Sequence, residues 1–105
     1  MNHKNLSDLE TFINKRGIST KTVVSHKTAT IKNLIMKPNE TIPPHQVPVD
    51  VTFFILSGSG TITIGKSDQT IVKNDIILCP PNTPMSLKAD DDGLTFLNIK
   101  TPGIQ

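Results

Sequence analysis

One histidine stands in a setting that could support chemistry. His45 follows Pro43 and Pro44, and an apolar run over residues 49–56 leads from it to Gly58-Ser59-Gly60. The run predicts a strand beginning next to the histidine, and the glycines predict a turn at its end. His45 could act as a general base, bind a ligand by a hydrogen bond, ligate a metal, or simply bond to a backbone carbonyl. Among aliphatic groups its charged form is disfavoured, so we expect a neutral imidazole at pH 7.

Three nearby signals favour structural roles. Gln46 would point away from His45 in a strand, which favours solvent or, at most, the rim of a pocket. Cys79 has no basic neighbour in sequence to lower its pKa, so we expect a core residue and not a nucleophile. Asp90-Asp91-Asp92-Gly93 lacks the alternating ligands of a calcium loop and predicts a solvated hairpin turn.

A short helix and a series of strands would have to position these groups. Ser7-Asp8-Leu9-Glu10 has the form of a capping box, and Phe12 and Ile13 continue the helical spacing until Gly17. This pattern predicts an N-terminal helix of about ten residues. Further strands are predicted at residues 21–24, 29–36, 51–56, 61–64, 69–72, 76–79, 85–88 and 94–100. We therefore expect an all-β jelly-roll barrel over residues 19–105, preceded by a helical segment over residues 1–18.

Composition narrows the function classes. The chain has 105 residues, which suits one domain with one modest core. Its charge of +2 is spread along the sequence without a basic cluster, and Trp and Tyr are absent, so we do not expect a nucleic-acid partner. No apolar run approaches the ~20 residues of a membrane span, and no secretory signal precedes the first strand. The single cysteine, Cys79, fits a reducing cytoplasm.

Two patterns of spaced residues are similar to the motifs of cupins. His45 and Gly58 match a first motif that contains His-x-His, a glutamate and a closing glycine, and Pro80 matches a second motif that contains Pro-x-Gly and a further histidine. Over about residues 32–102 the chain resembles small single-domain cupins of the conserved-barrel, RmlC-like type. The resemblance implies a cupin jelly-roll barrel and a homodimer. The apolar run 53–56 agrees with burial on both faces, inside the sandwich or at a dimer contact.

The departures from the cupin motifs separate fold from metal binding. Three motif glycines fall on Asn39, Asn74 and Asn82, and the remaining three ligand positions fall on Val47, Val51 and Met85. Asparagine is the commonest non-glycine residue at left-handed positions, so the turns should be preserved. Valine cannot ligate a metal, and methionine offers only a weak thioether. His45 is therefore the only retained ligand position, and we predict no cofactor and no usual cupin metal centre.

Other ligand sets stay open as alternatives. Asp50 is the nearest carboxylate, although strand alternation points it away from Val51 unless a local bulge turns it inward. His45, Met85 and Cys79 could form a soft site for Cu(I). A divalent transition metal on non-standard ligands is thus the alternative to a cofactor-free pocket.

The sequence favours a cytoplasmic cupin-domain protein that binds a small, partly apolar ligand. The expected pocket residues are His45, Val47, Val51, Phe53 and Met85. The first alternative is an enzyme, either a metal-dependent dioxygenase or isomerase with non-standard ligands, or a metal-free catalyst that uses His45 as acid or base. Metal-free epimerases with the cupin fold pair a histidine base with a tyrosine acid, which this chain lacks. A purely structural or interaction domain is the second alternative.

Overall fold

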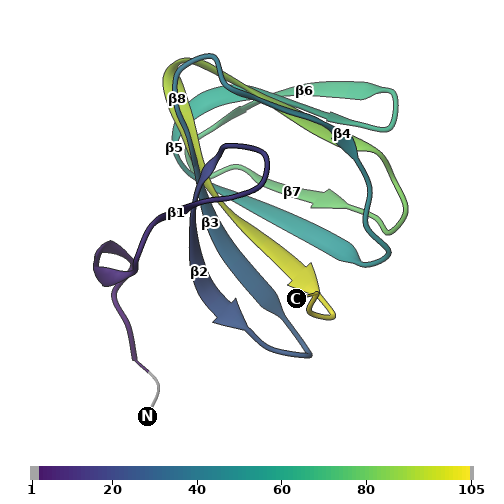
Figure 1. Ribbon diagram of the computed structural model, residues 1–105. Helices are drawn as coiled ribbons and strands as arrows, with labels where there is room; N and C mark the ends of the chain where they lie inside the picture. The colour runs from purple at the N-terminus through teal and green to yellow at the C-terminus, as the bar shows by residue number, and fades with distance from the viewer. Residues whose placement is uncertain (1–2, 105) are drawn as a thin grey trace.

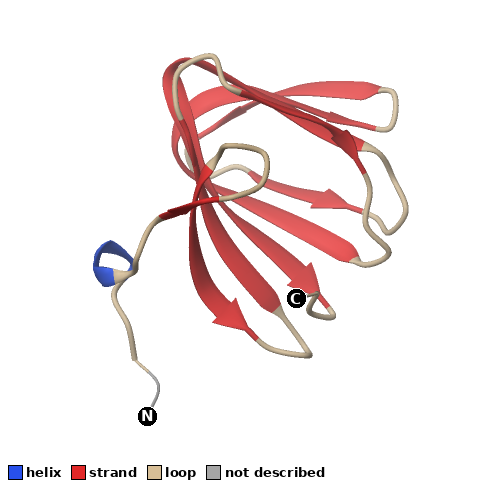
Figure 2. Cartoon of the chain, viewed as in Figure 1, coloured by secondary structure: helices blue, strands red, loops and turns tan. Residues whose placement is uncertain are grey.

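The computed structural model describes residues 3–104 and consists of two antiparallel β-layers that face each other (Figure 1). In chain order, the elements are the 3-10 turn η1 Leu6–Asp8 and the strands β1 Phe12–Ile13, β2 Ser19–Ser25, β3 Thr30–Met36, β4 Thr41–His45, β5 Asp50–Ile64, β6 Ser67–Val72, β7 Ile76–Cys79 and β8 Met85–Thr101. The predicted all-β jelly-roll class is confirmed (Figure 2). Within the described range, no helix has the length and hydrophobicity needed to cross a membrane.

Two long strands, β5 and β8, pass through both layers. The first part of β5 pairs with the last part of β8, from Asp50↔Thr101 to Gly58↔Leu94, in a layer with the order β1-β2-β3-β8-β5-β7, here called the β3 layer. The remaining parts pair from Gly60↔Ala89 to Ile64↔Met85 and form the β4 layer, in the order β4-β8-β5-β6. The two layers thus share their central strands and enclose one core.

Glycines allow the bend between the layers. Gly58 and Gly93 have φ values of +79° and +76°, and a Cβ on Gly58 would lie 2.1 Å from the carbonyl oxygen of Gly93. The predicted turns at Gly58-Ser59-Gly60 and at residues 90–93 are wrong, because both segments are bends within strands. Ser59 Oγ lies 3.0 Å from Asp90 Oδ2 and 2.8 Å from Asp92 Oδ1, which ties the two bends together. The chain therefore crosses between layers at these points instead of reversing.

The asparagine turns are confirmed. Asn39, Asn74 and Asn82 have φ values of 64°, 75° and 58°. The backbone N–H of Asn74 donates to the carbonyl of Ile55 at 2.8 Å, and that of Asn82 donates to the carbonyl of Val47 at 2.7 Å. The turn at Asn74 thus holds the loop before β7 against β5, and the turn at Asn82 holds the loop after β7 against the β4–β5 loop.

The N-terminal helix prediction is wrong beyond one turn. Only the 3-10 turn η1 forms, capped by Asn5, whose side-chain oxygen accepts the N–H of Ser7 at 2.9 Å. Phe12 and Ile13 form β1 and pair with β2. A helix of about ten residues gains little stability by itself, whereas pairing with β2 satisfies backbone groups of this segment. The segment therefore joins the sheet as a hairpin.

The core lies between the layers and follows the alternation of β5. Val51, Phe53 and Ile55 point inward and are at most 1% exposed, while Phe54 is half-buried on the other face. The rings of Phe53 and Phe96 have centroids 5.6 Å apart and are tilted by 57°, a favourable aromatic arrangement. These two rings form the floor on which the candidate site is built.

Candidate functional site

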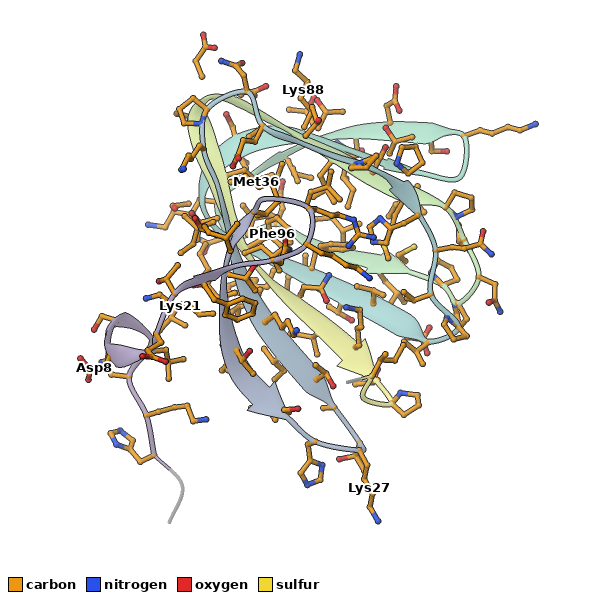
Figure 3. The ribbon with its side chains drawn as sticks, in the orientation of Figure 1. Asp8, Lys21, Lys27, Met36, Lys88 and Phe96 are labelled. Atoms are coloured by element: carbon orange, nitrogen blue, oxygen red, sulfur yellow. The ribbon has the colours of Figure 1, made fainter. Side chains whose placement is uncertain are left out.

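A cavity of about 420 Å³ lies between the β1–β2 turn and the inner faces of the two layers. Phe53 and Phe96 of the β3 layer and Ile42 and Leu87 of the β4 layer form its apolar wall. Figure 3 shows the side chains that fill the space between the layers, with Phe96 behind the turn. The polar lining comes from the turn, from β2 and β3, and from the ends of β4 and β8.

His45 lines this cavity from the end of β4. Its Nδ1 lies 3.1 Å from the carbonyl oxygen of Pro43, which can only accept, so Nδ1 carries the proton and Nε2 keeps its lone pair. Burial lowers the pKa of His45 below its usual 6.5, the charges of Arg16 and Lys100 lower it further, and the bond to Pro43 partly offsets both. The imidazole is therefore neutral at pH 7, with one nitrogen able to accept a hydrogen bond or a proton.

Cationic side chains reach the cavity from three elements. Lys32 on β3 is the cross-strand partner of Asn98 on β8, and Lys100 follows two residues later on the same face. Arg16 comes from the β1–β2 turn. Burial lowers the pKa of Lys100, and the neighbouring charges of Lys32 and Arg16 lower it further. The cavity thus combines an aromatic floor with a positively charged side.

Local hydrogen bonds and one glycine fix the conformation of the β1–β2 turn. The side-chain oxygen of Asn14 accepts the backbone N–H groups of Arg16 at 2.9 Å and Ile18 at 3.0 Å. Gly17 adopts φ +83° and so permits the tight reversal. The ammonium of Lys32 lies 5.7 Å from the ring centroid of Phe12, a cation–π distance that links β1, which leads into the turn, to β3.

The residues predicted for the pocket are divided between cavity and core. His45 and Phe53 line the cavity. Val51 and Met85 are fully buried in the core, and Val47 packs against it while half-buried. Cys79 is also a core residue, 1% exposed, and burial raises the pKa of its thiol.

Comparisons with known proteins identify the family. A profile of the cupin domain matches residues 33–99. The chain belongs to the cupin family. No curated protein sequence matches it.

Solved structures agree on the cupin fold at low sequence identity. An RmlC-like cupin from Shewanella frigidimarina has a TM-score of 0.91 at 8% identity, with 100% of this chain and 94% of that chain covered. KdgF from Halomonas sp. has a TM-score of 0.89 at 14% identity, with 96% and 93% covered. Oxalate decarboxylase from Bacillus subtilis, whose Mn(II) centres have been studied, has a TM-score of 0.82 at 20% identity, with 94% and 29% covered.

The donors around His45 do not fit a cupin metal centre. A metal centre of the cupin type needs three imidazoles and a carboxylate. Of the four motif positions only His45 provides an imidazole, and the other three carry Val47, Val51 and Met85. Asp50 is exposed and lies on the opposite face from Val51, as alternation predicts. Among the described residues, no group of three His, Cys, Asp or Glu side chains is placed to hold a metal ion. The charged and titratable groups that line this cupin pocket are its imidazole and its cations.

Sequence reasoning did not identify the cations of the pocket. The helix predicted for the N-terminus left Arg16 without a place in the barrel. A signal was present in the last strand, where Phe96, Asn98 and Lys100 alternate on one face and change from aromatic to polar. When the inward face of a strand becomes polar towards the strand end, this indicates that the strand end lines the mouth of a pocket.

Proposed function

We propose that this cupin domain binds a small, partly apolar organic molecule in the cavity beneath the β1–β2 turn, without the usual cupin metal centre. The make-up of the cavity is the observation that carries the proposal, because an aromatic and aliphatic wall faces a few converging polar groups. Small-molecule sites typically have this composition and volumes of about 300–1,000 Å³. The cavity of about 420 Å³ suits a ligand of metabolite size.

His45 supplies a directional contact in this proposal. Because Nδ1 is committed to Pro43, Nε2 is the nitrogen available to a ligand hydroxyl or amide N–H. The lowered pKa keeps the acceptor form at pH 7. The ligand would then have an apolar body and at least one polar group.

A thermal-shift screen of small metabolites tests the binding function. A ligand that binds the folded state raises the melting temperature according to its concentration and affinity. We expect at least one class to do so with the wild type and to lose the effect with His45→Ala. His3→Ala, at an exposed position outside the cavity, is the matched control. No shift across the screen, or a shift that His45→Ala leaves unchanged, would contradict the proposal.

The metal-free part of the proposal has a separate test. Elemental analysis of protein purified without chelator or affinity tag should find transition metals far below one equivalent per chain. Near-stoichiometric metal would contradict the absence of a metal centre, whatever the ligand screen finds.

Metal-free acid/base catalysis is the second candidate function. It is favoured by the neutral His45 imidazole, whose pKa is lowered mainly by burial and also by the Lys100 ammonium, a charge that could stabilise a developing oxyanion. Small carbonyl compounds incubated with the protein in D2O should then exchange protons next to the carbonyl, as followed by NMR. If exchange is absent, or if the His45→Gln variant exchanges as fast as the wild type, catalysis is excluded and ligand binding is the remaining function.

The expected homodimer and cytoplasmic setting belong to the same proposal. Ile76 and Leu78 on β7 are 70% and 60% exposed, which supports an apolar contact between two copies. Light scattering should give twice the chain mass, and a monomer at all concentrations would contradict the dimer. The single buried thiol of Cys79 suits a reducing compartment.

A further inference from the structure

The charged lining of the cavity has one sign. Lys15 and Arg16 come from the β1–β2 turn, Lys32 from β3 and Lys100 from β8. None of the described residues that line the cavity is acidic. A concave site whose charges share one sign concentrates the opposite charge.

Lys32 and Lys100 sit on adjoining strands. Thr30 pairs with Lys100 and Lys32 pairs with Asn98, so the two lysines are diagonal neighbours on one face. Both are half-buried, where water screens charge poorly. Burial is the main cause of the lowered pKa of Lys100, and the charges of Lys32 and Arg16 lower it further; an anion among the three cations would offset their repulsion.

A buried amide adds a second polar feature to the charged side. Asn98 lines the cavity, is 8% exposed, and its Oδ1 has no hydrogen-bond partner among the described residues. Buried polar groups are normally paired, and an exception calls for an explanation. A bound molecule can provide the pairing, either by donating to Oδ1 or by accepting from the amide after it turns.

The opposite side of the cavity is apolar. Phe53 and Phe96 are at most 1% exposed and present the tilted ring pair, while Ile42 and Leu87 close the wall from the β4 layer. A fully hydrated inorganic ion would leave this surface unused. A ligand with a hydrocarbon part would pack over this wall and cover apolar area of the more exposed lining residues, Phe12 at 42% exposed and the half-buried Leu34.

We infer that the ligand of this pocket is a small organic anion, with a carboxylate head among Arg16, Lys32 and Lys100 beside Asn98 and an apolar body against Phe53 and Phe96. This inference rests on the proposed binding function and names its ligand class. A guanidinium can hold a carboxylate through two parallel hydrogen bonds, and lysines add charge without that geometry. Arg16 on the turn would thus be the orienting contact.

A panel of matched probes tests the ligand class on the full chain. Hexanoate and benzoate carry the proposed head and body, hexanamide and benzamide remove only the charge, hexylamine reverses it, and inorganic phosphate removes the body. Binding is measured by calorimetry and by chemical-shift changes of 15N-labelled protein. We expect both carboxylates to bind at least about tenfold more tightly than their amides, since charge-assisted hydrogen bonds are roughly twice as strong as neutral ones. The shifts should fall on Phe96 and Asn98.

Variants that each remove one positive charge test where the carboxylate head group binds. Arg16→Gln changes an exposed side chain, and Lys100→Met replaces a half-buried charge by an apolar group of similar length, so both should fold. Each should weaken carboxylate binding at least about fivefold while leaving amide binding unchanged, because coupling to a charge is lost. Lys88→Gln is the matched control, since Lys88 is exposed on the same strand outside the cavity.

The outcomes separate this inference from the proposed function. Amides that bind as tightly as carboxylates, with shifts on Phe96 and Asn98, would overturn the anion and leave the binding function standing. Carboxylate binding unaffected by Arg16→Gln and Lys100→Met would also overturn it. Phosphate binding without carboxylate binding, or no binding by the whole panel at millimolar concentration, would overturn the organic anion. A metabolite hit that depends on His45 would still support the binding function.

Discussion

His45 on β4 is the cross-strand partner of Met85 on β8. The cupin motifs assign a metal ligand to both positions, so the backbone still holds the two sites face to face. Met85 is 1% exposed and belongs to the core cluster, while His45 is half-buried at the cavity. Of these two paired motif positions, one therefore carries an imidazole at the cavity and the other carries a core side chain.

Restoring the side chains should restore a metal site. We predict that the triple variant Val47→His, Val51→Glu, Met85→His takes up about one equivalent of Mn, Ni or Zn, since three imidazoles and one carboxylate suit such ions. Without metal it should be less stable by several kcal/mol, because Val51 is fully buried and an ionised carboxylate there is uncompensated. Elemental analysis after dialysis and melting curves with and without metal measure both effects.

The control for the restored site is Met85→His alone, which provides too few ligands for stoichiometric binding. A triple variant that folds yet binds no more metal than the wild type would contradict the idea that only the side chains are missing. It would mean that the backbone at Val47 or Val51 has moved from the arrangement of metal-binding cupins.

The fold could be predicted because its signals are local. Alternation marks the strands, and Asn39, Asn74 and Asn82 mark turns through their tolerance of left-handed backbone. The errors at the N-terminus and at Gly58 have a common cause. The capping-box pattern at Ser7 is compatible with a helix or with a strand segment, and pairing with β2 favours the strand. The glycine at position 58 is compatible with a turn or with a bend inside a strand, and the close approach of Gly93 favours the bend.

The candidate site was less predictable, because its polar groups are brought together only by the register in which the strands pair. His45 was found from its motif position. Lys32 and Asn98 are 66 positions apart in sequence and become neighbours through the β3–β8 pairing. Arg16 reaches the same cavity only because β1 folds back on β2. No local pattern in a single sequence contains this information.

The asparagine turn after β6 predicts a contrast between two substitutions. Asn74→Ala should cost about 1–2 kcal/mol, because a Cβ-bearing residue other than Asn or Asp is disfavoured at φ 75°. Asn74→Gly should be neutral or slightly stabilising for the same reason. Urea unfolding measures both. The neighbouring exposed Lys73→Ala should change stability by no more than about 0.5 kcal/mol, and an equal loss for Asn74→Ala and Lys73→Ala would refute the backbone explanation.

Two phenylalanines at the cavity should differ sharply in their contribution to stability. Phe96→Ala should lower the free energy of unfolding by about 3–5 kcal/mol, because the ring is fully buried against Phe53. Phe12→Ala should cost less than about 1 kcal/mol, since its ring is 42% exposed and loses mainly the cation–π contact with Lys32. Guanidinium unfolding gives both values.

If Phe96→Ala does not fold, Phe96→Leu gives a measurable substitute and should cost less than Phe96→Ala, because it leaves a smaller cavity. A Phe12→Ala cost as large as that of Phe96→Ala would show that the β1 hairpin is part of the cooperative core. The hairpin would then be unable to open independently of the barrel.

The pKa of His45 predicts how stability depends on pH. In the folded protein this pKa lies below 6.5, the usual value, mainly because of burial and also because of Arg16 and Lys100. Between the folded pKa and 6.5 the unfolded chain therefore binds more protons, and stability increases with pH in that window. On acidification, the free energy of unfolding should begin to fall near pH 6.5 and this contribution should level off below the folded pKa. Urea unfolding between pH 8 and pH 5 measures the curve.

Two variants assign the slope to the correct histidine. His45→Gln should remove this part of the acid loss, because the titrating group is gone, whereas His3→Gln removes an exposed histidine that does not line the cavity and should keep the loss. Arg16→Gln should reduce the loss without abolishing it, since burial is the larger cause of the lowered pKa and the Arg16 charge only adds to it. An unchanged slope in His45→Gln would mean that another group controls the acid response, and the neutral imidazole at pH 7 would lose its support.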